Sequence, residues 1–218
     1  MPRRLNLPDS ASVATPAPDG KLFAPSAARN VGAIAALLKN LAPVGNALEI
    51  ASGTGQHVVH FAQTLPQVTW QPTEIDPIRR ASIAAYLVEA DLPNVLPPVE
   101  LDATAAGWGV LHKGQNLITL CNLLHLVSED EARTLVSEAA QALAPDGLLM
   151  IYGPFKRGDV LVSDGDKSFD DSLRAQDPEI GYKSDATVVE WGESFGLTSL
   201  NLHEMPANNL ALLWQKPS

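Results

Sequence analysis

Short apolar runs and longer segments of helical spacing alternate along most of this chain. The apolar runs predict strands at 46–51, 68–73, 95–101, 116–121 and 147–153. Apolar residues at helical spacing predict helices at 26–41, 55–65, 77–90 and 128–144. Such alternation is typical of an α/β fold, in which helices cover both faces of a doubly wound, largely parallel sheet.

The pattern changes after Gly153. A polar segment at 154–183, rich in aspartate and glycine, is interpreted as a loop-like insertion on the substrate side. A helix is expected at 184–195, followed by strand-like runs at 197–204 and 209–215. A connection as short as the one between these runs forms a hairpin, so the last strand should be antiparallel.

Residues 1–24 differ in composition from the rest of the chain. Prolines and a glycine stand among small polar residues at 1–24, which disfavours regular structure and predicts a flexible arm or lid. The 45% hydrophobic content of the 218 residues can bury one sizeable core. We therefore expect a single domain at 25–218, with the arm and the 154–183 insertion forming a roof over the substrate.

Charge and cysteine content narrow the class of partner. The net charge of −10 and a pI near 4.8 disfavour nucleic acid, which selects a basic surface. Cys121 is the single cysteine, so an intrachain disulfide framework and a multi-cysteine zinc site are excluded and no metal is expected. No apolar run has the length of a signal peptide core or a membrane span, so we expect a cytoplasmic protein without a membrane partner. A homo-oligomer is allowed but not indicated.

The most informative segment runs from Leu48 to His57, where an apolar strand passes through Gly53 and Gly55 into a helix. Glycine lets the backbone bend sharply and approach a ligand closely. Three acids, Glu49, Glu74 and Asp102, stand at or near strand ends, where open parallel sheets place their ligand crevice. Carboxylates in this arrangement suit a neutral or cationic ligand better than a phosphate.

S-adenosylmethionine fits these acids better than a nicotinamide dinucleotide. A dinucleotide loop needs a third glycine, but Val58 occupies that position. S-adenosylmethionine carries an ammonium, a sulfonium and a ribose diol, for which Glu49 and Glu74 are natural partners. Asp102 and Ala103 would then hold the adenine. Each acid taken alone is about as well explained as a solvated strand end or a helix cap.

The chain resembles the class I methyltransferases, and more closely a family of unknown function that includes methyltransferase-like protein twenty-six. The resemblance extends from residue 22 to 218 and rests on Ser26-Ala27-Ala28-Arg29-Asn30, Ala51-Ser52-Gly53-Thr54-Gly55-Gln56-His57, Trp70-Gln71-Pro72, Asn122-Leu123-Leu124-His125, Tyr152-Gly153-Pro154-Phe155, Phe169-Asp170 with Leu173-Arg174, and Met205-Pro206-Ala207-Asn208-Asn209. It implies a seven-stranded Rossmann-like sheet that binds S-adenosylmethionine, with S-adenosylhomocysteine as product, and it carries over no substrate. Ala51 replaces a glycine that is frequent in the superfamily, and Glu74 and Leu123 replace the more usual Asp and Met.

Site residues follow from these motifs. The predicted cofactor-binding residues are Arg29, Glu49, Ala51, Ser52, Gly53, Thr54, Gly55, His57, Glu74, Ile75, Asp102, Ala103 and Asn122. Arg29 would pair with the donor's carboxylate, although a solvated helix residue is the commoner fate. Asp170 and Arg174, one helical turn apart, are expected to form a surface pair of little energetic weight.

His125 and Tyr152 are the predicted catalytic residues. His125 follows a strand near the expected reaction centre and would take a proton from the acceptor or orient it, against the alternative that it only packs. Tyr152 would orient the substrate, with Phe155, Asn208 and Asn209 as further substrate-binding residues, and of the two asparagines one is expected to be structural.

The predicted function is S-adenosylmethionine-dependent methyl transfer to a small-molecule acceptor. The alternative is a protein that uses the same cofactor for a cyclisation or an elimination, or that only senses it. A nicotinamide-dependent reductase is a third hypothesis, which Val58 and the acidic series disfavour.

Overall fold

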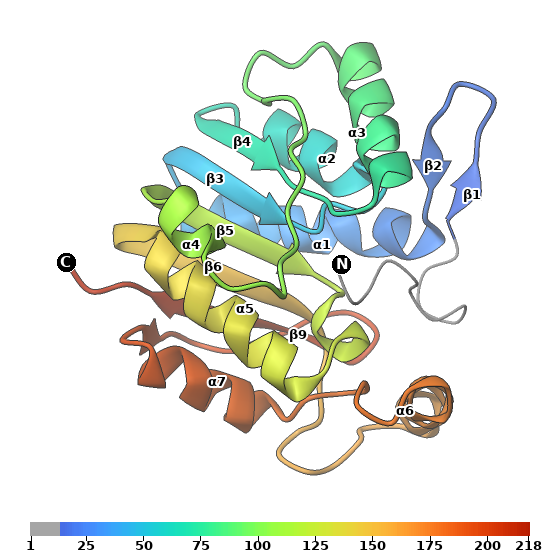
Figure 1. Cartoon of the computed structure of the whole chain (residues 1–218), viewed down its shortest axis with the longest axis vertical. Helices are drawn as coiled ribbons and strands as arrows, with labels where there is room; N and C mark the ends of the chain where they lie inside the picture. The colour runs from blue at the N-terminus through green and yellow to red at the C-terminus, as the bar shows by residue number, and fades with distance from the viewer. Residues whose placement is uncertain (1–13) are drawn as a thin grey trace.

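Consecutive apolar residues in the central strands bury both faces of one mixed sheet. The computed structural model describes residues 14–218 and places the strands in the order β4-β3-β5-β6-β9-β7, with β8 also paired to β9 (Figure 1). The parallel strands are β3 (Gly45–Ile50), β4 (Val68–Pro72), β5 (Gln115–Cys121) and β6 (Leu143–Pro154). β9 (Asn209–Gln215) runs antiparallel to β6, as predicted. The sheet thus has seven strands and the Rossmann-like arrangement expected from the sequence.

Helices cover both faces of this sheet. On one face α1 (Pro25–Leu41), α2 (Gln56–Thr64) and α3 (Pro77–Ala90) pack through a cluster that includes Ile34, Phe61 and Ile83. On the other face lie α4 (Trp108–Leu111), α5 (Glu129–Ala142) and α7 (Asp185–Ser194), whose core includes Leu135 and Trp191. Neighbouring strand residues contribute to opposite clusters, because side chains alternate across a strand.

Two of the predicted strands differ from the structure. The 95–101 run makes only isolated parallel bridges, from Val95 to Trp70 and from Val99 to Thr73. Pro97 and Pro98 lie between these bridges, and proline lacks the N–H that a ladder needs. The 197–204 run is divided into β7 (Thr198–Ser199) and β8 (His203–Glu204), which pair with the two ends of β9.

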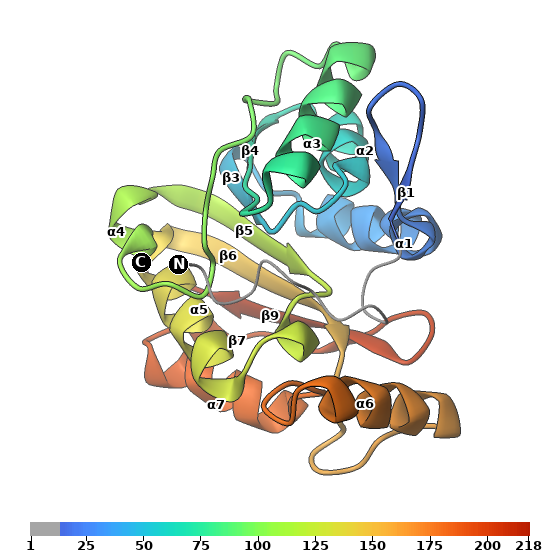
Figure 2. The ribbon, with the colours of Figure 1, turned by 45° about the vertical axis from the view of Figure 1, so that its right-hand side comes forward.

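The 154–183 insertion was wrongly expected to be loop-like, because it contains helix α6 (Asp164–Gln176). Ser163 caps this helix by accepting a hydrogen bond from the N–H of Asp166 at 3.1 Å. Figure 2 shows that α6 lies at the same end of the molecule as the loop that leads into β9 and the start of α1. A short 3₁₀ helix, η1 (Leu124–Leu126), follows β5 at this end.

The described part of the predicted arm is a small hairpin, β1 (Thr15–Pro16) with β2 (Leu22–Phe23). It docks on α3, where Ser82 Oγ accepts from the N–H of Leu22 at 2.8 Å and Lys21 pairs with Glu89. The remainder of the predicted arm, residues 1–13, lies outside the described residues.

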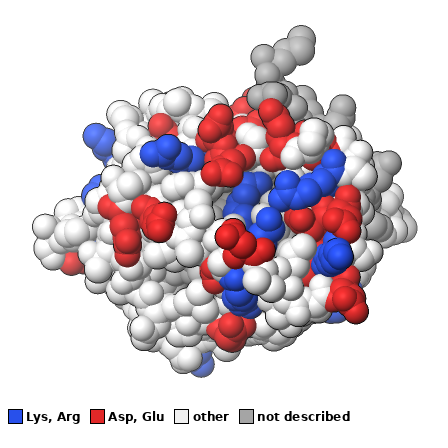
Figure 3. All heavy atoms as spheres, turned by 90° about the horizontal axis from the view of Figure 1, so that it is seen from below, with Lys and Arg blue, Asp and Glu red and all other residues white. Residues whose placement is uncertain are grey.

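Charges of both signs lie close together on the face seen in Figure 3, where Lys and Arg side chains are bordered by Asp and Glu. Over residues 14–218, no helix has the length and apolar character needed to cross a membrane.

Candidate functional site

The loop after β3 owes its shape to left-handed backbone conformations. Ala51, Gly53 and Gly55 have φ of 51°, 60° and 97°, and the first of these explains why glycine is common at position 51 in the superfamily. A Cβ on Gly55 would lie 2.9 Å from Cα of Ile83, so this glycine lets α3 pack closely on α2. A Cβ on Gly53 would meet Arg79 Nη1 at 3.5 Å and the carbonyl oxygen of Ala51 at 3.9 Å, both ordinary van der Waals contacts. Gly53 is therefore the glycine that leaves space for a ligand.

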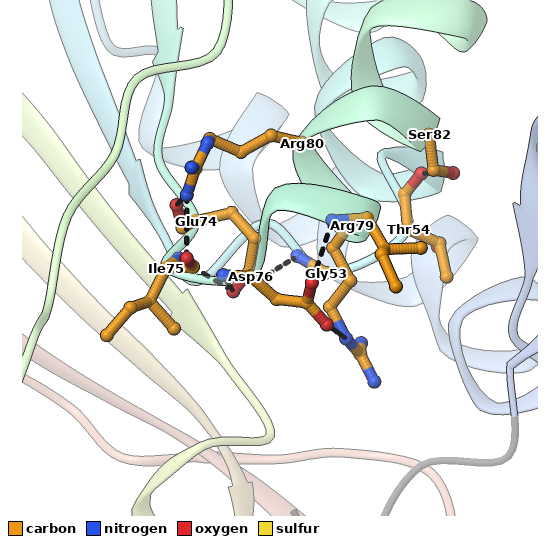
Figure 4. Close-up of polar contacts among 9 residues, drawn as sticks. Gly53, Thr54, Glu74, Ile75, Asp76, Arg79, Arg80 and Ser82 are labelled. Carbon is orange, nitrogen blue, oxygen red and sulfur yellow. Dashed lines mark hydrogen bonds and ion pairs between the residues drawn. The ribbon is translucent and has the colours of Figure 1, made fainter. Parts of the chain in front are cut away.

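Glu74 holds this loop to the end of β4. Its carboxylate accepts hydrogen bonds from the N–H groups of Gly53 at 3.0 Å, Ile75 at 2.8 Å and Asp76 at 3.1 Å (Figure 4). Burial raises the pKa of Glu74, while these backbone donors and the nearby Arg79 act in the opposite direction. The carboxylate is thus fixed in position before any ligand arrives.

Three adjoining cavities lie at the carboxyl ends of the parallel strands. The smallest, about 70 Å³, is lined by Ile75, Asp102, Ala103, Thr104, Leu101, Asp76 and Val127. It shares Ala51, Glu74, Arg79 and Leu123 with a second cavity of about 100 Å³ that also contacts Ser52, Gly53, Thr54 and His57. The second cavity shares Ser26 and Asn122 with a third of about 860 Å³. We call the third the large cavity.

Most predicted cofactor-binding residues line the two smaller cavities. Asp102 uses Oδ1 to accept from the N–H and the hydroxyl of Thr104, so Oδ2 can accept from a ligand. Asn122, with a φ of 58°, lies at the boundary with the large cavity. Val58 stands at the position where a dinucleotide loop would have its third glycine, and its side chain is fully buried in the core.

Glu49 lies behind the lining of these cavities. Its side chain is 2% exposed, its Oε2 has no hydrogen-bond partner, and burial raises its pKa to about 8. A hydrogen bond with Ser52 acts against this rise. An unsatisfied buried carboxyl oxygen is costly, so a cationic group bound nearby would stabilise it.

Asn30 lies between the second cavity and the large one. The Nε2–H of His57 donates to Oδ1 of Asn30 at 2.8 Å, and the Asn30 side chain lies near the Tyr152 hydroxyl, whose pKa it lowers. Burial lowers the pKa of His57 to about 4 and raises that of Tyr152 to about 12, so both rings are neutral at pH 7. Asn30 belongs to the Ser26–Asn30 motif, but the sequence alone assigned it no role.

His125 is packed among aromatic rings in the wall of the large cavity. Its ring centroid lies 5.8 Å from that of Phe169 and 6.1 Å from that of Tyr182. Burial, followed by the charge of Lys183, lowers the pKa of His125 to about 3. The ring is therefore neutral and weakly basic at pH 7, which suits an orienting role better than proton removal.

The structure places Arg29 and Phe155 elsewhere than predicted, and it divides the roles of Asn208 and Asn209 as expected. Arg29 lines the large cavity with Tyr152, and not the two smaller ones where the donor's carboxylate was expected. Phe155 is buried in the core on the α5 and α7 face, so its expected place in the substrate site is wrong. Asn209 lines the large cavity, whereas Asn208 donates to Asp166 at 3.2 Å and its carbonyl accepts from Arg157.

Asp170 and Arg174 do form an ion pair, at 2.8 Å, but Asp170 is only 4% exposed. Its other oxygen accepts from the N–H of Tyr182 at 2.6 Å. The carboxylate of the expected surface pair is thus buried, and it holds Tyr182 in the cavity wall, while the Arg174 side chain stays exposed. Sequence spacing revealed the Asp170–Arg174 pair, but it did not reveal that Asp170 also binds Tyr182 from the following loop.

Over residues 14–218, no group of three or more His, Cys, Asp and Glu side chains is arranged to hold a metal ion.

The seven-stranded sheet with its antiparallel last strand has a Rossmann-like fold of the kind found in class I methyltransferases. More particularly, the chain belongs to the family described as "Protein of unknown function (DUF938)", which matches residues 21–216.

Solved structures of methyltransferases share this fold. The chain is similar to an O-methyltransferase family protein from Burkholderia thailandensis, with 17% identity and a TM-score of 0.70 over 86% of this chain and 58% of that one. It is also similar to the mitomycin 7-O-methyltransferase MmcR, with 15% identity and a TM-score of 0.74 over 88% and 54% of the two chains. It is similar as well to the structure titled "PigF with SAH", with 17% identity and a TM-score of 0.67 over 78% of this chain and 50% of that one. The chain therefore spans little more than half the length of these proteins, and the likeness establishes the fold.

Proposed function

We propose that this protein transfers a methyl group from S-adenosylmethionine to a small-molecule acceptor. The observation that carries the proposal is the arrangement of the two small cavities, which meet at Glu74 and open at Asn122 onto the large one. Such an arrangement suits a donor that is bound separately and presents one end to an acceptor. The solved methyltransferases of this fold support the same reading.

The residues present fit the donor. The open space at Gly53 would receive its amino-acid part, and the unpartnered Glu49 oxygen provides a reason to bind a cation close by. Glu74 would accept from the ribose, and Asp102 and Ala103 would hold the adenine. When bound, S-adenosylmethionine supplies an electrophilic methyl group.

The chain's own contribution is mainly alignment. Asn122 and Tyr152 stand where the large cavity meets the donor side, so they would position the acceptor atom. The hydroxyl of Tyr152 lies near Asn30, and we assign His125 to orienting the acceptor, the second of the two roles predicted for it. Arg29 would contact the acceptor and not the donor.

Calorimetric titration of the purified protein with S-adenosylhomocysteine and with NAD tests the donor site. We expect S-adenosylhomocysteine to bind in the micromolar range and NAD to show no binding. Incubation with S-adenosylmethionine and candidate acceptors should then yield S-adenosylhomocysteine together with a product heavier by one methylene unit. Tight donor binding with an altered but unmethylated substrate would favour a non-methylating reaction, and binding of NAD alone would refute the proposal.

A further inference from the structure

The large cavity presents one uncompensated charge, and it is positive. Among the described residues that line it, Arg29 is the only charged side chain, although the whole chain has a net charge of −10. Arg29 is exposed and makes no hydrogen bond or ion pair within residues 14–218. A guanidinium is a planar fork of donors that matches a carboxylate, so an acidic ligand would complete it.

Two acids that bind the cavity-lining Tyr182 already have protein partners. Asp166 accepts from the Tyr182 hydroxyl at 3.3 Å and from the Asn208 amide at 3.2 Å. Asp170 is paired with Arg174 and with the N–H of Tyr182. Since both carboxylates are satisfied by protein donors, they leave the positive charge of Arg29 as the feature that a ligand would meet.

Flat apolar surfaces make up much of the remaining wall. The rings of His125, Phe169 and Tyr182 lie about 6 Å apart at mutual angles of 59° to 71°. At this spacing the three rings contact one another, so a ligand packs against the outer face of the group and not between its members. Pro25, Pro154 and Pro206 add further apolar wall. Aromatic ligands gain the most from surfaces of this kind.

We propose that the large cavity binds an aromatic acid, whose ring packs against the His125, Phe169 and Tyr182 group while its carboxylate pairs with Arg29. This inference rests on the proposed function, since it names the class of acceptor. The volume of about 860 Å³ accommodates one or two fused rings. A neutral His125 ring, whose pKa burial lowers to about 3, adds stacking surface without adding charge.

Matched probes separate the two elements of the proposal. The probes are 4-hydroxybenzoate, its neutral isostere 4-hydroxybenzamide, the non-aromatic 4-hydroxycyclohexanecarboxylate and the cation tyramine, each titrated with and without saturating S-adenosylhomocysteine. A two-ring probe, 6-hydroxy-2-naphthoate, tests size. We expect the aromatic carboxylates to bind about 10- to 100-fold more tightly than the amide, and tyramine to bind most weakly.

Variants assign these preferences to residues. Arg29→Gln should erase the preference for carboxylate over amide, whereas Lys113→Gln, the same charge change at an exposed position outside the cavity lining, should preserve it. Phe169→Leu should lower affinity for benzoate by about fivefold or more and leave the cyclohexane acid nearly unchanged. Circular dichroism and thermal unfolding confirm that each variant is folded.

The outcomes distinguish this inference from the proposed function. Equal affinity for carboxylate and amide, a preference for tyramine, or no probe binding to a protein that binds S-adenosylhomocysteine would overturn the inference and leave methyl transfer standing. If S-adenosylhomocysteine does not bind, the proposed function fails, and the titrations without it still decide whether the cavity selects aromatic acids.

Discussion

Asn30 and His57 form a buried hydrogen bond of 2.8 Å between helices α1 and α2, and the same asparagine lies near the hydroxyl of Tyr152. Asn30→Leu should lower the free energy of unfolding by about 1–3 kcal/mol, because it leaves the Nε2–H of His57 buried without an acceptor. Adding His57→Phe should recover at least half of that loss, since both polar partners are then gone. Urea unfolding of the two single variants and the double variant measures the coupling, and strictly additive losses would contradict it.

Gly53→Val should abolish binding of S-adenosylhomocysteine, because a branched side chain would fill the ligand space and strain a left-handed turn. Gly158 is a matched control: its φ is also 60°, and a Cβ there meets nothing within 4 Å. Gly158→Val should carry a similar backbone cost and bind normally. Unchanged affinity in folded Gly53→Val would remove this loop from the donor site.

Glu74→Ala should weaken S-adenosylhomocysteine by about 2 kcal/mol, as expected for the loss of charge-assisted hydrogen bonds. A carboxylate offers about four acceptor positions, and three backbone N–H groups already occupy three of those of Glu74. Binding both ribose hydroxyls therefore requires one backbone bond to be exchanged. A 2′-deoxy analogue should lose far less on the variant than on the natural protein, and equal losses would place Glu74 elsewhere.

Glu49 should make the protein less stable as pH rises. Its pKa in the folded state is about 8, above the ordinary value of 4.5, so its contribution is full below pH 4.5 and is lost as pH rises through 8. Glu49→Gln should flatten this dependence, which reaches about 1.4 kcal/mol per pH unit at most. Urea unfolding at pH 5.5, 7 and 8.5 compares the two proteins, and parallel curves would refute the shift.

Glu49 should also cause protons to be released when the donor binds. If the donor's ammonium binds near the unpartnered oxygen, the carboxyl ionises and about one proton is released at pH 7. Calorimetry of S-adenosylhomocysteine in buffers of different ionisation enthalpy measures this release. Glu49→Gln should abolish it, and release that persists in the variant would assign the proton to another group.

His125→Phe should retain turnover within about fivefold once an acceptor is known, because a phenyl ring replaces a neutral imidazole in the wall. Since burial lowers the pKa of His125 to about 3, its titration would affect rates only at acidic pH. A role as base would instead cost about 100-fold or more in both His125→Phe and His125→Ala and remove an acidic limb from the pH profile.

Local signals predicted the sheet and the glycine turn after β3. The apolar runs located β3, β4, β5, β6 and β9, because each carries buried apolar residues. The strand predicted at 95–101 was wrong, because Pro97 and Pro98 lack the N–H groups that a strand needs for pairing. Helix α6 was missed because it buries only Asp170 and Leu173 and so lacks an apolar stripe, although Ser163 is a typical cap.

The lining of the large cavity was harder to predict, because it is assembled from distant segments. Tyr182, Phe169 and Asn30 meet only in the folded chain, and no spacing between them could reveal it. Phe155 could have been assigned correctly. It lies three positions after Tyr152, and an odd separation along an extended strand places two side chains on opposite faces.

The position of β9 also has a consequence for how the chain is made. β9 is the last described strand in chain order, yet it lies inside the sheet. It pairs with β6 along one edge and with β7 and β8 along the other. During synthesis the edge of β6 therefore waits, unpaired and rich in apolar side chains, until residues 209–215 have emerged. Nascent chains halted before Asn209 should be recognised by chaperones, and completing this strand commits the whole sheet to its native pairing.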